Sequence, residues 1–240
     1  MYYYGMGYDS NYVIFLLFLG IALLIGSYAQ HLVNSRYATY RRVHTQNGLT
    51  GEQAARKVLD ANGLYDVPVE CISGKLTDHY DPKVNAVRLS EDIYNGDSVA
   101  AVGIACHEVG HAIQYNTNYA PIHIRAAIVP ITNLGAAISP YMILAGILIA
   151  SLNALAWIGL ILYSFSTIFQ LITLPVEMNA SSRALQTIKK MNLLETEEEY
   201  GGAKKVLTAA ALTYVAALVT SLVYLLRMVF MVLRNTRNDD

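Results

Sequence analysis

The sequence predicts a mainly α-helical integral membrane protein, with about four transmembrane helices and a small α+β portion. Three observations lead to this fold class. Charged residues make up 15% of the 240 residues, against about 25% in ordinary soluble domains. The apolar residues gather in long runs, each able to cross roughly 30 Å of hydrocarbon at about 1.5 Å per residue. Between the runs lie polar stretches with helix-capping and strand patterns.

The first apolar run covers residues 12–33 and predicts a transmembrane helix. A cleaved signal peptide is the alternative. The run is longer than the apolar core of a typical signal peptide, and no Lys or Arg precedes it. We therefore expect a retained membrane anchor.

Residues 34–125 form a polar segment with signals for both helix and strand. Thr50 and Gln53 have the spacing of a capping box that opens a helix, and Gly63 stands where such a helix would end. Val67 to Ile72 and Val84 to Leu89 have the β-branched, alternating pattern of short strands. This segment is the predicted α+β portion.

A further helix is expected at the end of this segment. Asp97 or Ser98 is a suitable N-cap, and the helix should run to about Asn116. Two apolar runs follow at residues 128–149 and 154–174, separated by so few residues that they predict a membrane hairpin. Its first arm contains two prolines, which membrane helices tolerate.

The last third of the chain alternates polar and apolar stretches once more. Residues 177–205 are polar, and residues 206–233 predict a fourth span. The acidic cluster Glu197 to Glu199 is expected in a solvated loop. Because the hairpin crosses the membrane twice, the chain after it returns to the side that it left. Residues 34–125 and 177–205 are therefore expected on the same side of the membrane.

The placement of basic residues predicts the orientation. Of the 17 Lys and Arg, none precedes the first span, nine lie within residues 36–125 and five within residues 183–205. Both polar segments should therefore face the cytoplasm. The remaining three, in residues 227–237, fit an external C-terminus poorly, so the fourth span could instead be interfacial or half-inserted. A net charge of −1 gives no broad basic field for nucleic acid.

The motif that carries chemistry is an HExxH formed by His107, Glu108 and His111. On a helix, positions four apart differ by about 40° around the axis, so both imidazoles face the same way and can bind one zinc ion. Glu108 is rotated off that pair, and it can take a proton from the water that such a site activates. Two histidines with an incidental Glu are the alternative interpretation.

A hydrolytic zinc site needs a third protein ligand and an open position. Four other histidines are candidates, and none follows His111 at the spacing of an extended HExxH motif. Glu177 is more informative because it lies two residues after Pro175, where the third span is expected to end. The hairpin brings it to the same side as the HExxH motif. An ordinary interfacial Glu is the alternative.

The chain resembles the bacterial neutral zinc metallopeptidases of the YugP type, which are small integral membrane proteins. The resemblance covers most of the chain and is carried by the stretches Leu76 to Pro82, Val87 to Ser90, His107 to Gln114 and Leu174 to Ser181. More distantly, the chain is similar to HtpX and CAAX-prenyl-protease types of membrane metallopeptidase. The resemblance implies one membrane metallopeptidase domain over residues 1–240.

This resemblance implies roles for particular residues. Glu177 becomes the third zinc ligand, and Ser181 takes the place of an Asp that orients a zinc-binding His in the distant relatives. A strand edge beside the metal is expected to bind substrate, and Asn85, Ala86, Val87 and Arg88 are the candidates. Arg183 is the leading candidate for stabilising the oxyanion, ahead of Tyr80 and His79.

The predicted function is a zinc-dependent endopeptidase with one zinc per chain, a protein or peptide substrate and a multi-pass location in the cell membrane, its active site facing the cytoplasm. Contact with membrane lipid is expected, and nucleic acid is not an expected partner. The alternatives are a non-catalytic zinc-containing scaffold or chaperone and a transporter. Ionisable residues are nearly absent from the spans beyond Arg227, which argues against transport.

Overall fold

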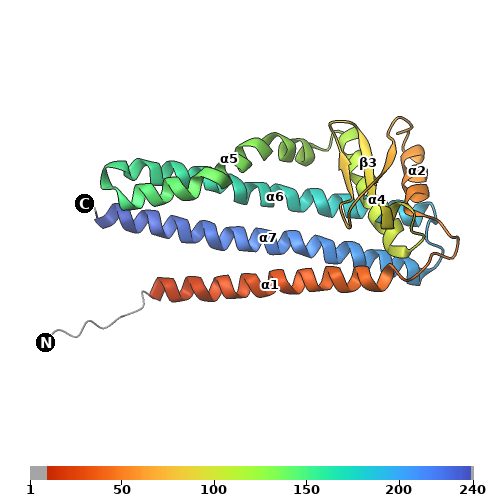
Figure 1. Ribbon diagram of the computed structural model, residues 1–240, viewed down its shortest axis with the longest axis horizontal. Helices are drawn as coiled ribbons and strands as arrows, with labels where there is room; N and C mark the ends of the chain where they lie inside the picture. Colours follow the sequence, from red (N-terminus) through yellow and green to blue (C-terminus); the bar gives the residue numbers. More distant parts are fainter. Residues whose placement is uncertain (1–9, 239–240) are drawn as a thin grey trace. The chain divides into compact units, whose positions relative to one another are not determined.

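The computed structural model describes residues 10–238. Over this range the chain forms seven α-helices, one short 3₁₀ turn and a three-stranded sheet (Figure 1). The helices are α1 (Ser10–Tyr40), α2 (Gly51–Ala61), α3 (Glu91–Tyr94), α4 (Val99–Asn116), α5 (Ala120–Leu148), α6 (Asn153–Lys190) and α7 (Glu197–Asn238), and the strands are β1 (Val69–Ile72), β2 (His79–Asp81) and β3 (Ala86–Ser90). The predicted fold class is confirmed: the chain is mainly helical, with a small α+β part.

Four helices in the described range are long and apolar enough to cross a membrane, which is the number that the sequence predicts. They are α1, α5, α6 and α7. Their hydrophobic windows keep most residues on the protein surface, with 11% buried in α1 and in α7. The exact membrane boundaries and the sidedness stay predictions.

The chain divides into two compact units. Within the described residues, the span unit comprises the chain up to Tyr28, Arg125–Leu171 and the chain from Val215 onward. The site unit comprises Ala29–Ile124 and Ile172–Tyr214. Each of the four long helices contributes residues to both units.

Close helix contacts hold the span unit together. A Cβ at Gly135 on α5 would lie 2.6 Å from the carbonyl oxygen of Leu162 on α6, so the two helices need a residue without a side chain there. Small residues at helix contacts are typical of membrane bundles. Pro130 and Pro140 both lie inside α5, which continues through them as expected.

The site unit has a conventional hydrophobic core built around α4. Of its 18 residues, 14 are buried, among them the small residues that allow neighbouring elements to approach. The predicted capping box at Thr50 and Gln53 is confirmed, with both hydrogen bonds at 3.3 Å. Gly63 ends this helix with a φ of +72°, and Ser98 caps α4 by accepting a hydrogen bond from the backbone of Ala101.

The sheet has the order β1-β3-β2, with β3 in the middle. β3 pairs in parallel with β1 and antiparallel with β2. Strands β1 and β3 fall where the sequence predicts strands, whereas β2 is an addition. It has three residues, which is too short for a periodic pattern to indicate.

Helix α6 continues through Pro175 to Lys190, so the predicted end of the third span lies inside a helix. One expectation about the last third of the chain is wrong. The acidic cluster is not a solvated loop, because Glu197 to Glu199 form the first turn of α7. The carboxylate of Glu199 is buried and accepts backbone hydrogen bonds from Thr196, Glu195 and Gln46, so it caps the helix and joins it to the loop after α1.

Candidate metal centre

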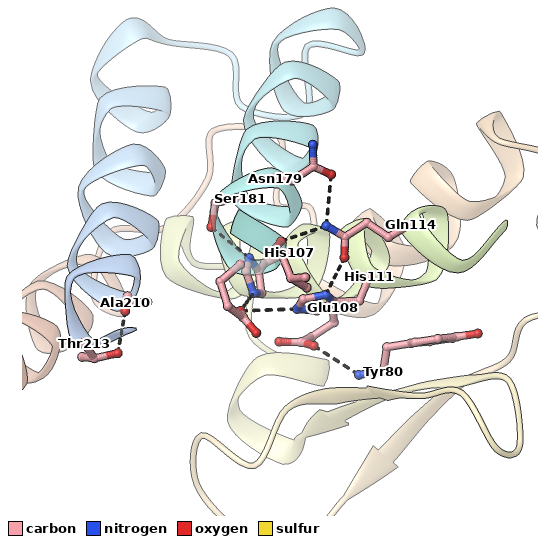
Figure 2. Close-up of polar contacts among 11 residues, drawn as sticks. Tyr80, His107, Glu108, His111, Gln114, Asn179, Ser181, Ala210 and Thr213 are labelled. Carbon is pink, nitrogen blue, oxygen red and sulfur yellow. Dashed lines mark hydrogen bonds and ion pairs between the residues drawn. The ribbon is translucent and has the colours of Figure 1, made fainter. Parts of the chain in front are cut away.

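Helix α4 carries three of the predicted site residues in one turn. His107 and His111 lie four positions apart on the same helix face, and their ring centroids are 4.8 Å apart. Glu108 lies beside them, largely buried. Because α4 is packed on nearly all sides, the rings of the two histidines are held in the interior of the site unit (Figure 2).

Helix α6 brings Glu177 to these two histidines. Its Oε2 lies 3.3 Å from His107 Nε2 and 3.5 Å from His111 Nε2, and the residue is only 3% exposed. The close approach depends on Gly110, where a Cβ would lie 2.7 Å from the carbonyl oxygen of Ala180 on α6. A side chain at this position would therefore push α6 away from the histidines.

The three side chains have the chemistry of a zinc site. One ligand atom from each residue lies within 4.8 Å of the other two. Two imidazole nitrogens and a carboxylate oxygen form a donor set typical of catalytic zinc, which keeps one position open. The arrangement therefore fits a bound zinc ion.

The electrostatics of the cluster also favour a cation. Burial lowers the pKa of His111, but its hydrogen bond to Glu177 and the charges of Glu108 and Glu177 outweigh burial, so the pKa is raised above its usual value. Negative charge from Glu177 and Glu108 thus converges on the imidazole of His111. A divalent cation at this place would be stabilised by the same charge.

Each histidine is oriented by a hydrogen bond at its other ring nitrogen. His107 Nδ1 lies 3.1 Å from Ser181 Oγ, and His111 Nδ1 lies 3.0 Å from the side-chain oxygen of Gln114. A proton on Nδ1 in each ring donates to these oxygens and leaves Nε2 with its lone pair toward the cluster. The contact of Ser181 is the one that the resemblance implies.

Gln114 is a site residue that the sequence analysis did not single out. It is fully buried, and its amide nitrogen donates to the carbonyl oxygen of Val176 at 2.8 Å and to the side chain of Asn179 at 3.0 Å. It therefore connects His111 to the turn of α6 that carries Glu177 (Figure 2). A polar residue three positions after His111, in a helix with a largely apolar sequence, was the available signal.

Strand β2 holds the carboxylate of Glu108. The backbone N–H of Tyr80 donates to Glu108 Oε2 at 3.1 Å (Figure 2). Glu108 is not one of the three converging donors, which agrees with its rotation off the histidine face. A carboxylate fixed by a backbone donor has little freedom to turn, and its second oxygen remains available for a proton.

Comparison with known proteins identifies the family. A family model described as "Putative neutral zinc metallopeptidase" matches residues 14–233 of the chain. The chain belongs to this family. A protein of Bacillus subtilis (strain 168) named "Putative membrane protease YugP" is 48% identical over 225 residues, which cover 93% of this chain and 99% of that protein. No solved structure matches the chain.

Family membership confirms the predicted resemblance and agrees with the donor set. It also explains why the signals for a membrane protein and for a zinc site occur in one chain, since the Bacillus relative is named as a membrane protease. The roles of individual residues do not follow from membership and are taken up below.

Arg183 is held by contacts with Asn179 and Tyr119. Its Nε donates to the side chain of Asn179 at 2.7 Å, and its guanidinium lies over the ring of Tyr119, 5.9 Å from the centroid. A chain of hydrogen bonds through Asn179 and Gln114 connects it to His111. The structure therefore gives it a place in the network behind His111, and its predicted part in oxyanion stabilisation stays untested.

The expected substrate-binding edge at Asn85 to Arg88 needs correction. Ala86, Val87 and Arg88 belong to β3, the middle strand, whose backbone is paired on both sides. An added strand needs unpaired backbone groups, and β3 offers none here. Asn85 precedes the strand with a φ of +53° and accepts a hydrogen bond from the hydroxyl of Tyr80, so these residues support the sheet instead.

Proposed function

We propose that the protein is a zinc-dependent membrane endopeptidase in which His107, His111 and Glu177 hold one zinc ion and Glu108 is the general base. One observation carries the proposal: three ligand atoms from two helices converge within 4.8 Å in the interior, next to a fixed carboxylate that is not part of the cluster. Family membership supports zinc as the metal.

The reaction is the hydrolysis of a peptide bond. When bound, zinc supplies Lewis acidity, which makes water acidic enough to act as a nucleophile near pH ~7 and polarises a carbonyl group. Glu108 accepts a proton from the attacking water as the new C–O bond forms. It then donates that proton to the leaving nitrogen as the C–N bond breaks. The hydrogen bond from Tyr80 keeps the carboxylate oriented through both steps.

Ser181 and Gln114 support this chemistry without touching the substrate. Each accepts a hydrogen bond from Nδ1 of one histidine. Both tautomers are thereby fixed with Nε2 toward the cluster, which is the form that binds a metal. The same hydrogen bonds prevent the rings from turning away when the substrate binds.

The proposed location is the cytoplasmic face of the cell membrane, with membrane lipid around the spans and a protein or peptide as substrate. The four long apolar helices and the membrane protease relative support a membrane location. The cytoplasmic orientation rests on the basic residues between the first two spans and between the last two. Spans at residues 12–33, 128–149, 154–174 and 206–233 belong to this proposal.

A non-catalytic zinc scaffold is the second candidate. Structural zinc sites are usually closed by four protein ligands, often cysteines. In the part of the chain that the structure describes, the single group with three or more His, Cys, Asp or Glu donors has three members and no cysteine. The open fourth position and the adjacent Glu108 favour the enzyme.

Cleavage of an unfolded protein such as casein by the detergent-solubilised, zinc-loaded protein tests the proposal. We expect cleavage that is lost on chelation and restored by zinc. Glu108→Gln should keep its zinc and lose about 10² to 10⁴ of the rate, because it lacks the general base. Glu91→Gln, an exposed residue at the start of α3, is the matched control and should cleave normally. If Glu108→Gln cleaves casein at the wild-type rate, Glu108 is not the general base. If the zinc-loaded wild type does not cleave casein, the scaffold is favoured.

A further inference from the structure

A cavity opens directly beside the candidate metal centre. Its volume is about 200 Å³, and His107, Glu108, Glu177 and Ser181 form part of its wall. All residues that line it belong to the site unit. The cavity is therefore continuous with the place where the reacting bond must lie if Glu108 is the base.

The remaining wall is mostly apolar and comes from three helices and from the segment before β2, which contributes Leu76 and Asp78. Ile104 lies three positions before His107 on α4 and so points to the same side. On α1, Val33 and Tyr37 are one turn apart, and on α7 a stripe at helical spacing includes Ala210 and Tyr214. The helical residues of the wall thus lie at the spacing of regular helix faces.

Small residues on α7 create the space. Ala210 and Ala211 both line the cavity, as do Val206 and Leu207 one turn earlier. An apolar cavity of about 150 Å³ binds a molecule the size of benzene. The volume found here is therefore sufficient for one large side chain such as that of Phe or Leu, and a larger residue in place of Ala210 would reduce it.

The charge on the wall excludes one class of ligand. Asp78 lines the cavity, with its carboxylate held by hydrogen bonds from the backbone and hydroxyl of Ser90 at 2.7 and 3.0 Å. None of the described residues that line the cavity is Lys or Arg. An acidic side chain would lie next to the carboxylate of Asp78, with no Lys or Arg on the wall to neutralise it, which is costly. The donors from Ser90 already occupy Asp78, which makes it a weak partner for a basic side chain.

We propose that this cavity binds the side chain of the substrate residue next to the scissile bond, and that it selects a large apolar residue there. The inference rests on the proposed function, because the position of the scissile bond is taken from Glu108. Ala210 is then a specificity-determining residue, and Tyr214 lines the cavity one turn later on the same helix.

The test uses peptides that differ only in the residue beside the cleaved bond, which is Ala, Phe, Asp or Lys. For the wild type, kcat/KM should be at least about tenfold higher with Phe than with Ala, and lowest with Asp. Ala210→Leu should lower kcat/KM for the Phe peptide more than for the Ala peptide and so remove the advantage of Phe. Thr208→Leu, which adds the same side chain at an exposed position of α7, should leave both rates unchanged.

Binding separates this inference from the proposed function. The same peptides are titrated against zinc-loaded Glu108→Gln, with and without Ala210→Leu, and followed by fluorescence anisotropy. If the wild type cleaves no peptide but the Phe peptide still binds more tightly than the Ala peptide, and Ala210→Leu removes the difference, the cavity assignment stands while the peptidase proposal fails.

Three results would overturn the inference: equal rates and affinities for Ala and Phe, a preference for Asp or Lys, or an equal effect of Ala210→Leu on all peptides. If Ala210→Leu does not fold, as judged by zinc content and melting temperature, Tyr214→Ala replaces it. Enlarging the cavity should then shift the preference from Phe toward Trp, and an unchanged preference contradicts the assignment.

Discussion

The span unit and the site unit treat large apolar side chains in opposite ways. On α1, Leu24 is 71% exposed, and many leucines and isoleucines of the long helices have comparable exposure. In the site unit, Leu59 and Leu89 are fully buried within one continuous core. The difference teaches that the two units are built for different solvents: lipid can cover the first, while the second has to exclude water by its own packing.

The two units also differ in how precisely their side chains must be positioned. The site unit packs α4 against α6 so closely that the ligand atoms of three residues meet. The exposed faces of the spans do not require such close packing. Substitutions should therefore have large effects on zinc binding in the site unit and small effects on the exposed faces of the spans. The predictions below run from the largest effect to the smallest.

The largest effect is expected from Gly110→Ala. The added Cβ would lie 2.7 Å from the carbonyl oxygen of Ala180, so α6 must shift and carry Glu177 away from the histidines. We expect loss of bound zinc, measured as metal content after purification. Gly20→Ala on α1 is the matched control, because its Cβ meets no atom within 4 Å. Full zinc occupancy in Gly110→Ala would contradict the claim that the site unit tolerates an added side chain less well than the exposed face of a span.

Leucine truncation compares the two packings directly. Leu59→Ala in the site unit should cost about 2–5 kcal/mol of unfolding free energy, because it leaves a cavity in the core. Leu24→Ala, at an exposed position, should cost about 0.5 kcal/mol or less. The measurement is the urea midpoint of zinc release in a mild detergent. Equal midpoint shifts would contradict the assignment of these surfaces to lipid and to a closed core.

Ser181→Ala tests the support of the metal centre. Removing the hydroxyl leaves His107 Nδ1 without its partner at 3.1 Å, and zinc affinity should fall about 10- to 100-fold. Competition with a fluorescent chelator measures the change. Ser182→Ala, at the exposed neighbouring position, should retain wild-type affinity. If both variants bind zinc equally, Ser181 does not orient the histidine.

The two cysteines give the smallest and most local comparison. Burial raises the pKa of the Cys106 thiol to about 12, whereas Cys71 is exposed. Because the thiolate is the reactive form, Cys106 should resist alkylation in the native protein at neutral pH and react as the pH rises toward its pKa. Mass spectrometry should find Cys71 alone labelled before denaturation. Native labelling of Cys106 would mean that the core around α4 opens readily.

Local sequence patterns predicted much of this fold because they reflect interactions among neighbouring residues and with the solvent. The capping box at Thr50 and Gln53 and the cap at Ser98 are short-range hydrogen bonds that a few residues define. The long apolar runs predicted four spans because solvent preference depends on composition. The start of α7 was also accessible in this way: Thr196 and Glu199 form a capping box that was overlooked.

The remaining features depend on contacts between distant segments. The central position of β3 is decided by the pairing of β2, which has too few residues to be predicted.

The same holds for the candidate site. The spacing of His107 and His111 follows from one helix, and chain topology indicated the side on which Glu177 lies. The contacts of Gln114 with Val176 and Asn179 join residues more than 60 positions apart, and the support of Glu108 by Tyr80 joins two separate elements. Sequence spacing carries no information on these contacts.

The most direct test of the central claim is the zinc content of purified wild type, Glu177→Gln and Glu108→Gln. We predict about one zinc per chain in the wild type and in Glu108→Gln, and its loss from Glu177→Gln, because Glu177 is one of three converging donors and Glu108 is not. Zinc retained by Glu177→Gln at wild-type affinity, or lost from Glu108→Gln, would contradict this assignment of ligand and base.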